Sequence, residues 1–259
     1  FDTLLYTGNQ TDRRIGGLNF QPDLVWGFAR DASPASGHWL YDSVRGDTKQ
    51  IESNNAGVES TQPTMLTEFN QDGFSMGTDT AGNKNSTNFV AWCWKAGNKT
   101  TENSDGTITV TTSVNQDAGF SIIRGTAVNV QANDMSETFG HGLTEAPDII
   151  IQKNLDAAVD WMVFHPPVTN SNLKGLKLNS SDAMFTNGSY KTFEITDTLI
   201  KHGRQGVETN GNKFIVYAWH SVEGYSKFGS FEGNNNADGP FIYLGFKPEW
   251  LMVKNVDTT

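Results

Sequence analysis

Two separate blocks of this sequence recur at one spacing. Residues 89–94 (FVAWCW) align with residues 214–219 (FIVYAW), and residues 22–26 (PDLVW) align with residues 147–151 (PDIII). The offset is 125 residues for both blocks, since 214 − 89 and 147 − 22 give the same number. Two blocks with a shared offset indicate two copies of one structural unit, because chance similarity would not preserve the spacing between them.

Between these blocks, residues 39–41 (WLY) are matched to residues 161–163 (WMV), which implies a shorter loop in the second copy. We therefore expect residues 20–26 and 89–94 to form strands equivalent to those of residues 145–151 and 214–219.

A third copy begins near the end of the sequence. Residues 245–253 (GFKPEWLMV) are similar in sequence to residues 20–25 (FQPDLV). Residues 225–259 are therefore expected to supply two or three strands of a third unit. Half a sandwich cannot bury its own apolar face. We expect this segment to pack on the second unit, to pair with a neighbouring chain, or to be continued by residues outside this sequence, and we favour the last two.

The local patterns predict strands and no long helix. Residues 107–111 (TITVT) alternate polar and apolar side chains, as a half-buried strand does, and residues 160–164 (DWMVF) suit a more deeply buried strand. The sequence thus predicts an all-β fold of tandem antiparallel β-sandwich units, of jelly-roll or concanavalin-like type, with a partial third repeat. The expected divisions are unit 1 at 1–97, an ordered bridge with a strand at 98–118, unit 2 at 119–224, and the third repeat at 225–259.

Charge and hydropathy exclude several kinds of partner. The net charge is −10 and the pI is about 4.9. An acidic surface repels phosphate, so we expect no nucleic acid and no anionic membrane as partner. The longest apolar run, residues 214–219, is too short to cross a bilayer. No basic and apolar leader opens the chain, and Phe1 replaces an initiator Met, which indicates a processed product or a piece of a longer polypeptide.

Cys93 is the single cysteine of the chain. One cysteine excludes an intrachain disulfide framework and a cysteine-based zinc site. Its apolar strand context predicts a small buried core residue.

Few residues fit a catalytic or metal-binding pattern. Residues 73–77 (GFSMG) match the G-x-S-x-G nucleophile motif, which needs a strand turning sharply into a helix to expose the serine. No helical pattern follows, so Ser75 is interpreted as part of an ordinary hairpin. None of the five histidines has a metal-binding spacing; they are His38, His141, His165, His202 and His220. His38 and His165 flank the matched Trp strands, but nothing in the pattern requires a pocket there.

One loop resembles the start of a calcium site. Asn234, Asn236, Asp238 and Gly239 fit its first positions, but the twelfth position is Gly245 instead of a bidentate acid. We expect a tight loop closed by side-chain to backbone hydrogen bonds, with no metal. The sequence assigns no catalytic, cofactor, metal or ligand-binding residue.

The tryptophans recur at repeat positions within apolar strands, which predicts core packing for Trp92, Trp94, Trp161, Trp219 and Trp250. Aromatic rings for sugar stacking are better sought in loops, at Tyr190 or Tyr225. N-x-S/T triplets stand at Asn9, Asn85, Asn98, Asn179 and Asn187, and they indicate glycosylation only in a chain secreted by a eukaryote.

The amino-acid sequence of the repeat resembles that of a known kind of domain. The segments that carry the likeness include residues 17–25 (GLNFQPDLV), 41–46 (YDSVRG), 89–97 (FVAWCWKAG) and 222–230 (VEGYSKFGS). They are similar to an uncharacterised repeated domain in virion proteins of marine tailed phages, especially cyanophages. The likeness covers nearly the whole chain. It implies a tail-fibre-like or appendage protein and brings no catalytic motif.

These observations favour a non-enzymatic structural component of a phage virion, such as a tail fibre, a spike or a capsid or tail appendage, located on the extracellular particle. Its expected partners are other virion proteins or copies of itself, and a cell-surface glycan during host attachment. The alternative is a secreted bacterial carbohydrate-binding or adhesin module. Both use β-sandwiches, so the fold alone does not separate them. A hydrolase would need a convergent acid pair or triad, and the sequence suggests none.

Overall fold

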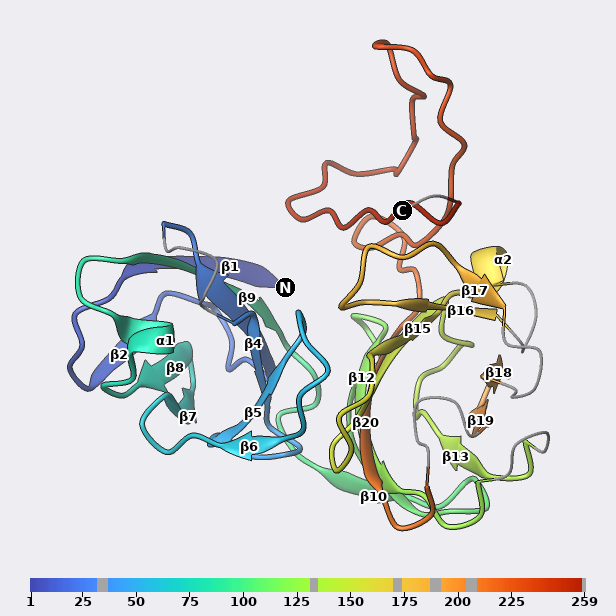
Figure 1. Cartoon of the computed structure of the whole chain (residues 1–259), viewed down its shortest axis with the longest axis horizontal. Coiled ribbons are helices and arrows are strands. Elements are labelled where there is room, and N and C mark those ends of the chain that lie inside the picture. Colours follow the sequence, from blue (N-terminus) through green and yellow to red (C-terminus); the bar gives the residue numbers. More distant parts are fainter. Residues whose placement is uncertain (32–36, 131–134, 170–173, 187–191, 204–208, 258–259) are drawn as a thin grey trace.

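The chain is nearly all β in the computed structural model, which describes residues 1–31, 37–130, 135–169, 174–186, 192–203 and 209–257. These residues contain twenty strands and two single-turn helices, and every strand pair is antiparallel. The predicted all-β antiparallel sandwich is confirmed (Figure 1).

Unit 1 pairs a six-stranded sheet with a three-stranded sheet. The larger sheet has the order β1 (Asp2–Thr7), β9 (Asn88–Trp94), β3 (Leu24–Ala29), β4 (Trp39–Asp42), β5 (Lys49–Glu52) and β6 (Ser60–Thr61). The smaller sheet has the order β2 (Arg13–Gly16), β8 (Gly73–Met76) and β7 (Leu66–Asn70), and helix α1 (Thr80–Asn83) lies between β8 and β9 in the chain.

Unit 2 repeats this plan on a wider sheet. Its larger sheet has the order β10 (Thr101–Asn103), β11 (Val110–Asn115), β12 (Phe120–Thr126), β20 (Lys213–Trp219), β14 (Ile149–Asn154), β15 (Met162–Phe164), β16 (Lys174–Lys177) and β17 (Phe185–Thr186). Its smaller sheet has the order β13 (Thr138–Gly140), β19 (Leu199–His202) and β18 (Phe193–Ile195), and helix α2 (Pro166–Thr169) follows β15.

The two units share one topology, as the repeat predicts. Strands β3 and β14 have the same length and lie 125 residues apart, and so do β9 and β20. In unit 1, the last strand, β9, lies between β1 and β3. In unit 2, the last strand, β20, lies between β12 and β14. The predicted equivalence of these strands is therefore confirmed, but β3 and β14 begin four residues later than the predicted strands at residues 20–26 and 145–151.

The predicted match of Trp39 to Trp161 is wrong by one residue. Val25 pairs with Tyr41, and its equivalent Ile150 pairs with Phe164, so the structural partner of Trp39 is Met162. A slip of one residue reverses the face of a strand. Trp39 accordingly points into the core of unit 1, whereas Trp161 lies in the cluster between the two units.

A difference in side-chain size between equivalent positions explains why this register cannot be recognised from the sequence. Trp39 stands opposite Gly27 in the β3–β4 pair, and the Trp39 ring occupies the space that a Cβ at residue 27 would need. In unit 2 the corresponding pair is Gln152 with Met162. Unit 1 thus has a large side chain opposite a glycine, whereas unit 2 has two side chains of medium size at the equivalent positions. A tryptophan in unit 2 therefore does not mark the position equivalent to Trp39.

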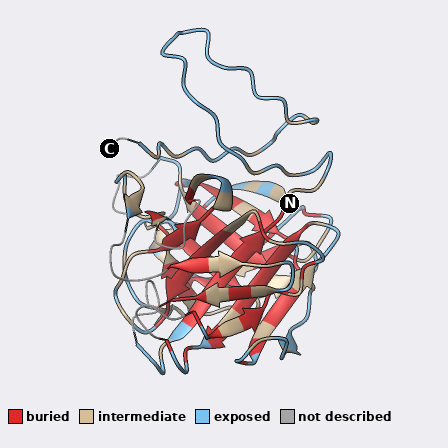
Figure 2. Cartoon of the chain, turned by 90° about the vertical axis from the view of Figure 1, so that its right-hand side faces the viewer, coloured by how far each residue is buried: buried red, intermediate tan, exposed pale blue. Residues whose placement is uncertain are grey.

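Three hydrophobic clusters form the core. One lies between the two sheets of unit 1 and a second between the two sheets of unit 2. The third joins the large sheet of unit 1 to the large sheet of unit 2, so the molecule is a stack of four sheets. Figure 2 shows buried residues filling the strands of this stack.

The bridge between the units differs from the expected one. Strands β10 and β11 join the edge of the large sheet of unit 2, next to β12. Strand β11 begins at Val110, so the predicted strand at residues 107–111 starts three residues too early. Thr107 instead exchanges hydrogen bonds with Thr138, the first residue of β13.

The C-terminal tail, residues 225–257, contains none of the two or three strands expected there. Within the described part of this tail, the only ladder contact is an isolated bridge from Val222 to Ser226. The chain runs as an extended coil away from the stack and back across its top, drawn in orange and red in Figure 1.

The register correction can be tested at Gly27. A Gly27→Ala change should lower the free energy of unfolding by about 1–3 kcal/mol, because the new methyl group overlaps the buried Trp39 ring. Urea unfolding would measure the loss. Gly239→Ala is the matched control, since nothing lies within 4 Å of its Cβ. Equal stability of the two variants would contradict the proposed packing.

Candidate functional site

Ser75 lies in the middle of strand β8, within the β7–β8 hairpin, so the interpretation as a hairpin residue is confirmed. Its Oγ donates a hydrogen bond to Asn70 Oδ1 at 3.0 Å. The expectation that no helix follows needs correction, because α1 begins at Thr80, but this single turn leaves Ser75 inside a strand. Ser75 also lines an open groove of about 700 Å³ with acidic and basic side chains of both signs: Asp12, Arg13, Arg14, Asp47 and Glu68.

The structure places His38 and His165, the two histidines that flank the matched Trp strands, in different surroundings. His38 precedes β4 and packs on Phe28, whereas His165 follows β15 and contacts the Asp148 carbonyl through Nδ1 at 2.5 Å. These two rings therefore lie at opposite ends of equivalent strands. Burial lowers the pKa of both His38 and His141. Across the described residues, no three His, Cys, Asp or Glu side chains gather in a way that could hold a metal ion.

The loop that resembles a calcium site is closed by its own side chains, as expected. Asn234 Oδ1 accepts from the Asn236 amide at 3.1 Å, and Asn236 Oδ1 accepts from the Asp238 amide at 3.0 Å. Asn234 Nδ2 also donates to the Asp238 carbonyl at 2.9 Å.

The remaining residues singled out in the sequence differ in burial and in whether the structure describes them. Cys93 is fully buried in the core of unit 1, as predicted, and burial raises the pKa of its thiol. Tyr225 is partly exposed, and its hydroxyl accepts from the amino group of Phe1 at 2.9 Å. Tyr190 and Asn187 lie outside the described residues. Among the other N-x-S/T sites, three are exposed: Asn9, Asn85 and Asn98.

Asn179 is unlike those three sites because its side-chain amide is engaged. Its Oδ1 accepts from the Trp161 amide at 2.9 Å, and its Nδ2 donates to Asp160 at 2.8 Å. The side chain thus fixes the start of strand β15.

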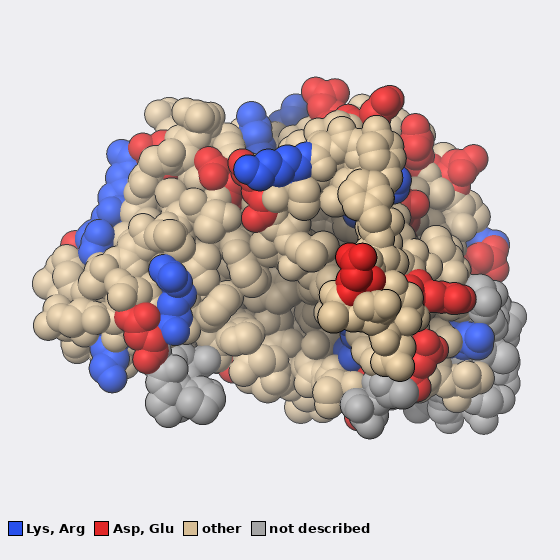
Figure 3. Space-filling view, turned by 90° about the horizontal axis from the view of Figure 1, so that it is seen from above, with Lys and Arg blue, Asp and Glu red and all other residues tan. Residues whose placement is uncertain are grey.

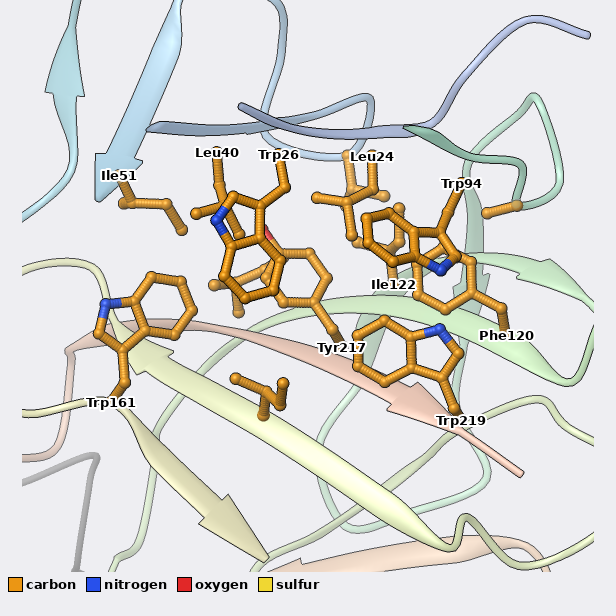
Figure 4. Packing of buried hydrophobic residues seen from close by; sticks show 14 of the residues in the cluster. Leu24, Trp26, Leu40, Ile51, Trp94, Phe120, Ile122, Trp161, Tyr217 and Trp219 are labelled. Atoms are coloured by element: carbon orange, nitrogen blue, oxygen red, sulfur yellow. The ribbon is translucent and has the colours of Figure 1, made fainter. Parts of the chain in front are cut away.

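The buried aromatic cluster between the units contains three of the predicted core tryptophans. Trp94 from unit 1 packs at 6.3 Å on Trp219 from unit 2. Trp219 in turn stacks on Phe120 at 4.9 Å, and Trp161 lies parallel to Tyr217. Figure 4 shows these side chains interleaving from the two facing sheets. Trp92 and Trp250 are only partly buried against this cluster.

A buried polar contact crosses the same interface. The Tyr217 hydroxyl donates to Asp42 Oδ2 at 2.7 Å, and Arg45 Nε donates to the same carboxylate at 2.5 Å. Asp42 and Arg45 are both fully enclosed as side chains, and the remaining Arg45 nitrogens donate to the carbonyls of Lys49 and Leu40. Burial raises the pKa of Tyr217, so its hydroxyl stays protonated and acts as the donor.

Two further contacts connect the units through main-chain oxygens. The buried Lys153 ammonium donates to the carbonyls of Asn154 at 2.8 Å, Val159 at 3.0 Å and Ala56, a unit 1 residue, at 3.3 Å. Burial lowers the pKa of Lys153 to about 8. Trp161 Nε1 donates to the Glu52 carbonyl at 2.8 Å. These contacts satisfy polar groups that the apolar interface would otherwise leave unpaired.

The repeated Pro-Asp pairs have a role that pattern reasoning missed. Asp23 Oδ2 accepts from the amides of Ala96 and Asn98, which follow strand β9. In unit 2, Asp148 Oδ2 accepts from the amide and hydroxyl of Ser221, which follows β20, each at 2.6 Å. The aspartate therefore fixes the exit of the last strand in each unit. Its recurrence after proline was the signal that could have revealed it.

The C-terminal tail returns over both units. Trp250 packs on Trp94 at 5.6 Å and on Trp92 at 5.7 Å, above unit 1. Further along, the Val256 carbonyl accepts from the Met184 amide at 2.9 Å, above unit 2. Figure 3 views this face, where charged side chains lie mostly towards the rim and uncharged residues occupy much of the centre.

The middle of the tail remains uncovered. Phe241 is 88% exposed, Tyr243 73% and Leu251 72%, and Val253 and Phe231 are also more than half exposed. The described remainder of the chain exposes large apolar side chains only singly, as at Leu5 and Val128. Contiguous exposed apolar residues of this kind mark interaction surfaces. The tail is therefore the candidate functional site.

Comparison with known proteins places the whole chain, residues 1–259, in one family, whose description is "Domain of unknown function (DUF7483)". The chain belongs to the DUF7483 family. The DUF7483 match extends over both sandwich units and the tail. No curated protein and no solved structure matches this DUF7483 chain. Among the described residues, neither helix has the length or the apolar character needed to traverse a bilayer.

The contact between the units can be tested at Tyr217. A Tyr217→Phe change should lower the free energy of unfolding by about 1–3 kcal/mol, because it leaves the buried Asp42 carboxylate without one donor. The midpoint of urea unfolding would report the loss. Tyr243→Phe removes a hydroxyl from an exposed ring and should change stability by less than about 0.5 kcal/mol. A Tyr217→Phe protein as stable as its parent would overturn the role given to this contact.

A second prediction concerns acid stability and the core of unit 2. His202 Nε2 lies 2.6 Å from Glu137 Oε1, while Glu137 Oε2 accepts from the amides of Val128 and Asn129. Burial by itself would raise the pKa of Glu137. The hydrogen bonds from His202 and from the two amides outweigh burial and hold the pKa below its ordinary value of 4.5.

A carboxyl with a lowered folded-state pKa stabilises the fold above its unfolded pKa, and this contribution is lost as the pH falls through the folded value. Glu137→Gln should therefore be less stable than the parent near neutral pH and lose less stability below about pH 4.5. Urea unfolding across a pH series measures both slopes, with exposed Glu232→Gln as the control. Parallel curves for Glu137→Gln and the parent would exclude this coupling.

Proposed function

We propose that this chain is a non-enzymatic structural component of a phage virion, namely a tail fibre, a spike or a capsid or tail appendage. It lies on the extracellular particle and takes part in host-surface attachment. Its partners are other virion proteins or copies of itself, with a cell-surface glycan as the contact on the host.

The observation that carries this proposal is the uncovered apolar tail. Phe241, Tyr243 and Leu251 are exposed on a segment that repeats the opening of the sandwich units. A soluble chain that presents such a surface gains stability when another polypeptide covers it. Assembly into a larger particle is a function that uses this property.

The use of the buried ionisable groups gives further support. Asp42, Arg45 and Lys153 are buried. Their hydrogen bonds connect neighbouring strands or the two units. Catalytic groups, by contrast, are typically perturbed residues that face a cleft. The arrangement is that of a rigid building block.

The alternative, a secreted bacterial carbohydrate-binding or adhesin module, has one observation in its favour. An open groove of about 540 Å³ on unit 2 is lined by hydroxyl and cationic side chains, among them Thr107, Thr109, Thr111, Arg124, Thr126 and Lys213. Hydroxyl groups and cations of this kind can hydrogen-bond to sugars, and acidic sugars would suit the two positive charges.

Antibodies raised against the purified chain test the proposal. They should label discrete positions on particles released from the source of the gene, as seen by electron microscopy, and detect the chain in gradient-purified particles. Detection only in particle-free culture medium, together with saturable binding on a glycan array, would reject the virion proposal and support the adhesin module.

A further inference from the structure

The open groove on unit 2 lies on the face of the large sheet that also meets unit 1, and its volume is about 540 Å³. Arg124 of β12 stands opposite Thr111 of β11, and Thr126 of β12 stands opposite Lys213 of β20. Residues that are directly paired, or two apart on one strand, point to the same face of a sheet. All four side chains therefore share one face, just beyond Ile122 of the inter-unit cluster, and all four line the groove.

The Arg124 side chain has no partner in the part of the chain that the structure describes. Its Nε is buried and makes no hydrogen bond there, and none of the ion pairs between described residues includes Arg124. A buried N–H group without an acceptor is costly, and most such groups in native proteins are paired. A ligand in the groove could supply the acceptor that the guanidinium lacks.

The groove is positive although the molecule is acidic. The chain has a net charge of −10, yet the described residues that line this groove include two cations and no carboxylate. Asp156 Oδ1 lies 3.7 Å from Lys213 Nζ, and Glu102 of edge strand β10 stands opposite Thr111. Neither of these acids lines the groove, and the Lys213 side chain is still 50% exposed. An anionic group from outside would therefore meet two positive charges.

The two cations are particular to unit 2. Through the pairing of β12 with β20 and of β1 with β9, Arg124 corresponds to Leu5 and Lys213 corresponds to Asn88. Leu5 is 64% exposed, so the repeated fold does not need a cation at this position. The charge of Arg124 is therefore not explained by folding, which favours a role in binding.

We propose that this groove binds an acidic sugar, whose carboxylate or sulfate group lies between Arg124 and Lys213. A guanidinium presents paired N–H donors that match two oxygens of such a group. The inference rests on the glycan contact in the proposed function, because it names the class of sugar and the residues that hold it.

The rest of the lining favours a sugar over other anions. Thr109, Thr111 and Thr126 bring hydroxyl groups that can hydrogen-bond with those of a sugar. The Thr107 hydroxyl is already used, because it donates to main-chain carbonyls. Val128, which is 63% exposed, adds an apolar surface for the C–H groups of a sugar ring. A volume of about 540 Å³ is also typical of small-molecule sites. Nucleic acid is disfavoured, because the acidic molecule would repel a long run of phosphates.

Titration of the purified full chain with three related sugars tests the proposal. Sialyllactose carries a carboxylate, lactose sulfate carries a sulfate ester, and lactose carries neither. By calorimetry, we expect saturable binding of at least one acidic sugar and at least about tenfold weaker binding of lactose, which lacks the charged hydrogen bonds. Comparison of the two acidic sugars distinguishes a carboxylate site from a sulfate site. A short single-stranded oligonucleotide should also bind at least about tenfold more weakly.

Variants locate the binding surface. Arg124→Gln should weaken binding of the acidic sugar at least about tenfold. Because the Arg124 Nε has no partner among the described residues, this change should not lower the melting temperature, which distinguishes a ligand contact from a structural one. Arg30→Gln is the matched control, since it removes the same charge from an exposed position on unit 1 and should bind normally. Lys213→Gln is a second variant, at a half-exposed side chain, and should also weaken binding.

Failure of both acidic sugars to bind, equal affinity for lactose or for the oligonucleotide, or normal binding by Arg124→Gln would overturn the sugar site. The titration uses only purified protein, so its outcome is independent of whether antibodies find the chain in particles. Binding without particle labelling would retain the groove and reject the virion, whereas labelling without binding would retain the virion and reject the groove.

Discussion

The packing of one large sheet against the other is the contact on which the rest of the molecule depends. Strands β9 and β20 are apolar on both faces, so each needs cover from two sides. The small sheet of each unit covers one face, and the other unit covers the second. A separate unit would therefore expose a sheet face that includes Trp26 or Tyr217, at a cost of about 25 cal/mol per Å² of apolar surface. The two units are separate in topology but share one core.

The same constraint explains the polar groups inside the stack. The Tyr217 hydroxyl and the Asp42 carboxylate meet each other within the apolar layer, and Lys153 reaches carbonyls of both units. Such groups contribute most by fixing one register of the two sheets, since any sliding would leave them unpaired in a dry environment. Hydrophobic packing of the two sheets has little directional preference by itself, and these polar contacts add a specific alignment.

The C-terminal tail, in its described part, lacks the strand pairing that stabilises the two units. It docks where a ready surface exists, through Trp250 on Trp92 and Trp94 and through Val256 on Met184. Elsewhere it has strand-forming residues but no neighbouring strand, and an unpaired strand has no independent stability in water. Apolar residues such as Leu251 therefore stay exposed to solvent.

The repeat, the all-β class and the hairpin around Ser75 follow from the amino-acid sequence alone, because repeat offsets, period-two alternation and turn residues can be recognised without tertiary context. The sequence also contained the tail as a third copy. The folded molecule is needed to show which face of a doubly apolar strand packs against which neighbour, because a strand without a polar face has no sequence signal for its orientation. For that reason the sequence pattern aligns Trp161 with Trp39, and it gives no indication of the Tyr217–Asp42 contact. The tail's lack of strands also depends on tertiary context, because strands in a sheet are stabilised by partners distant in sequence.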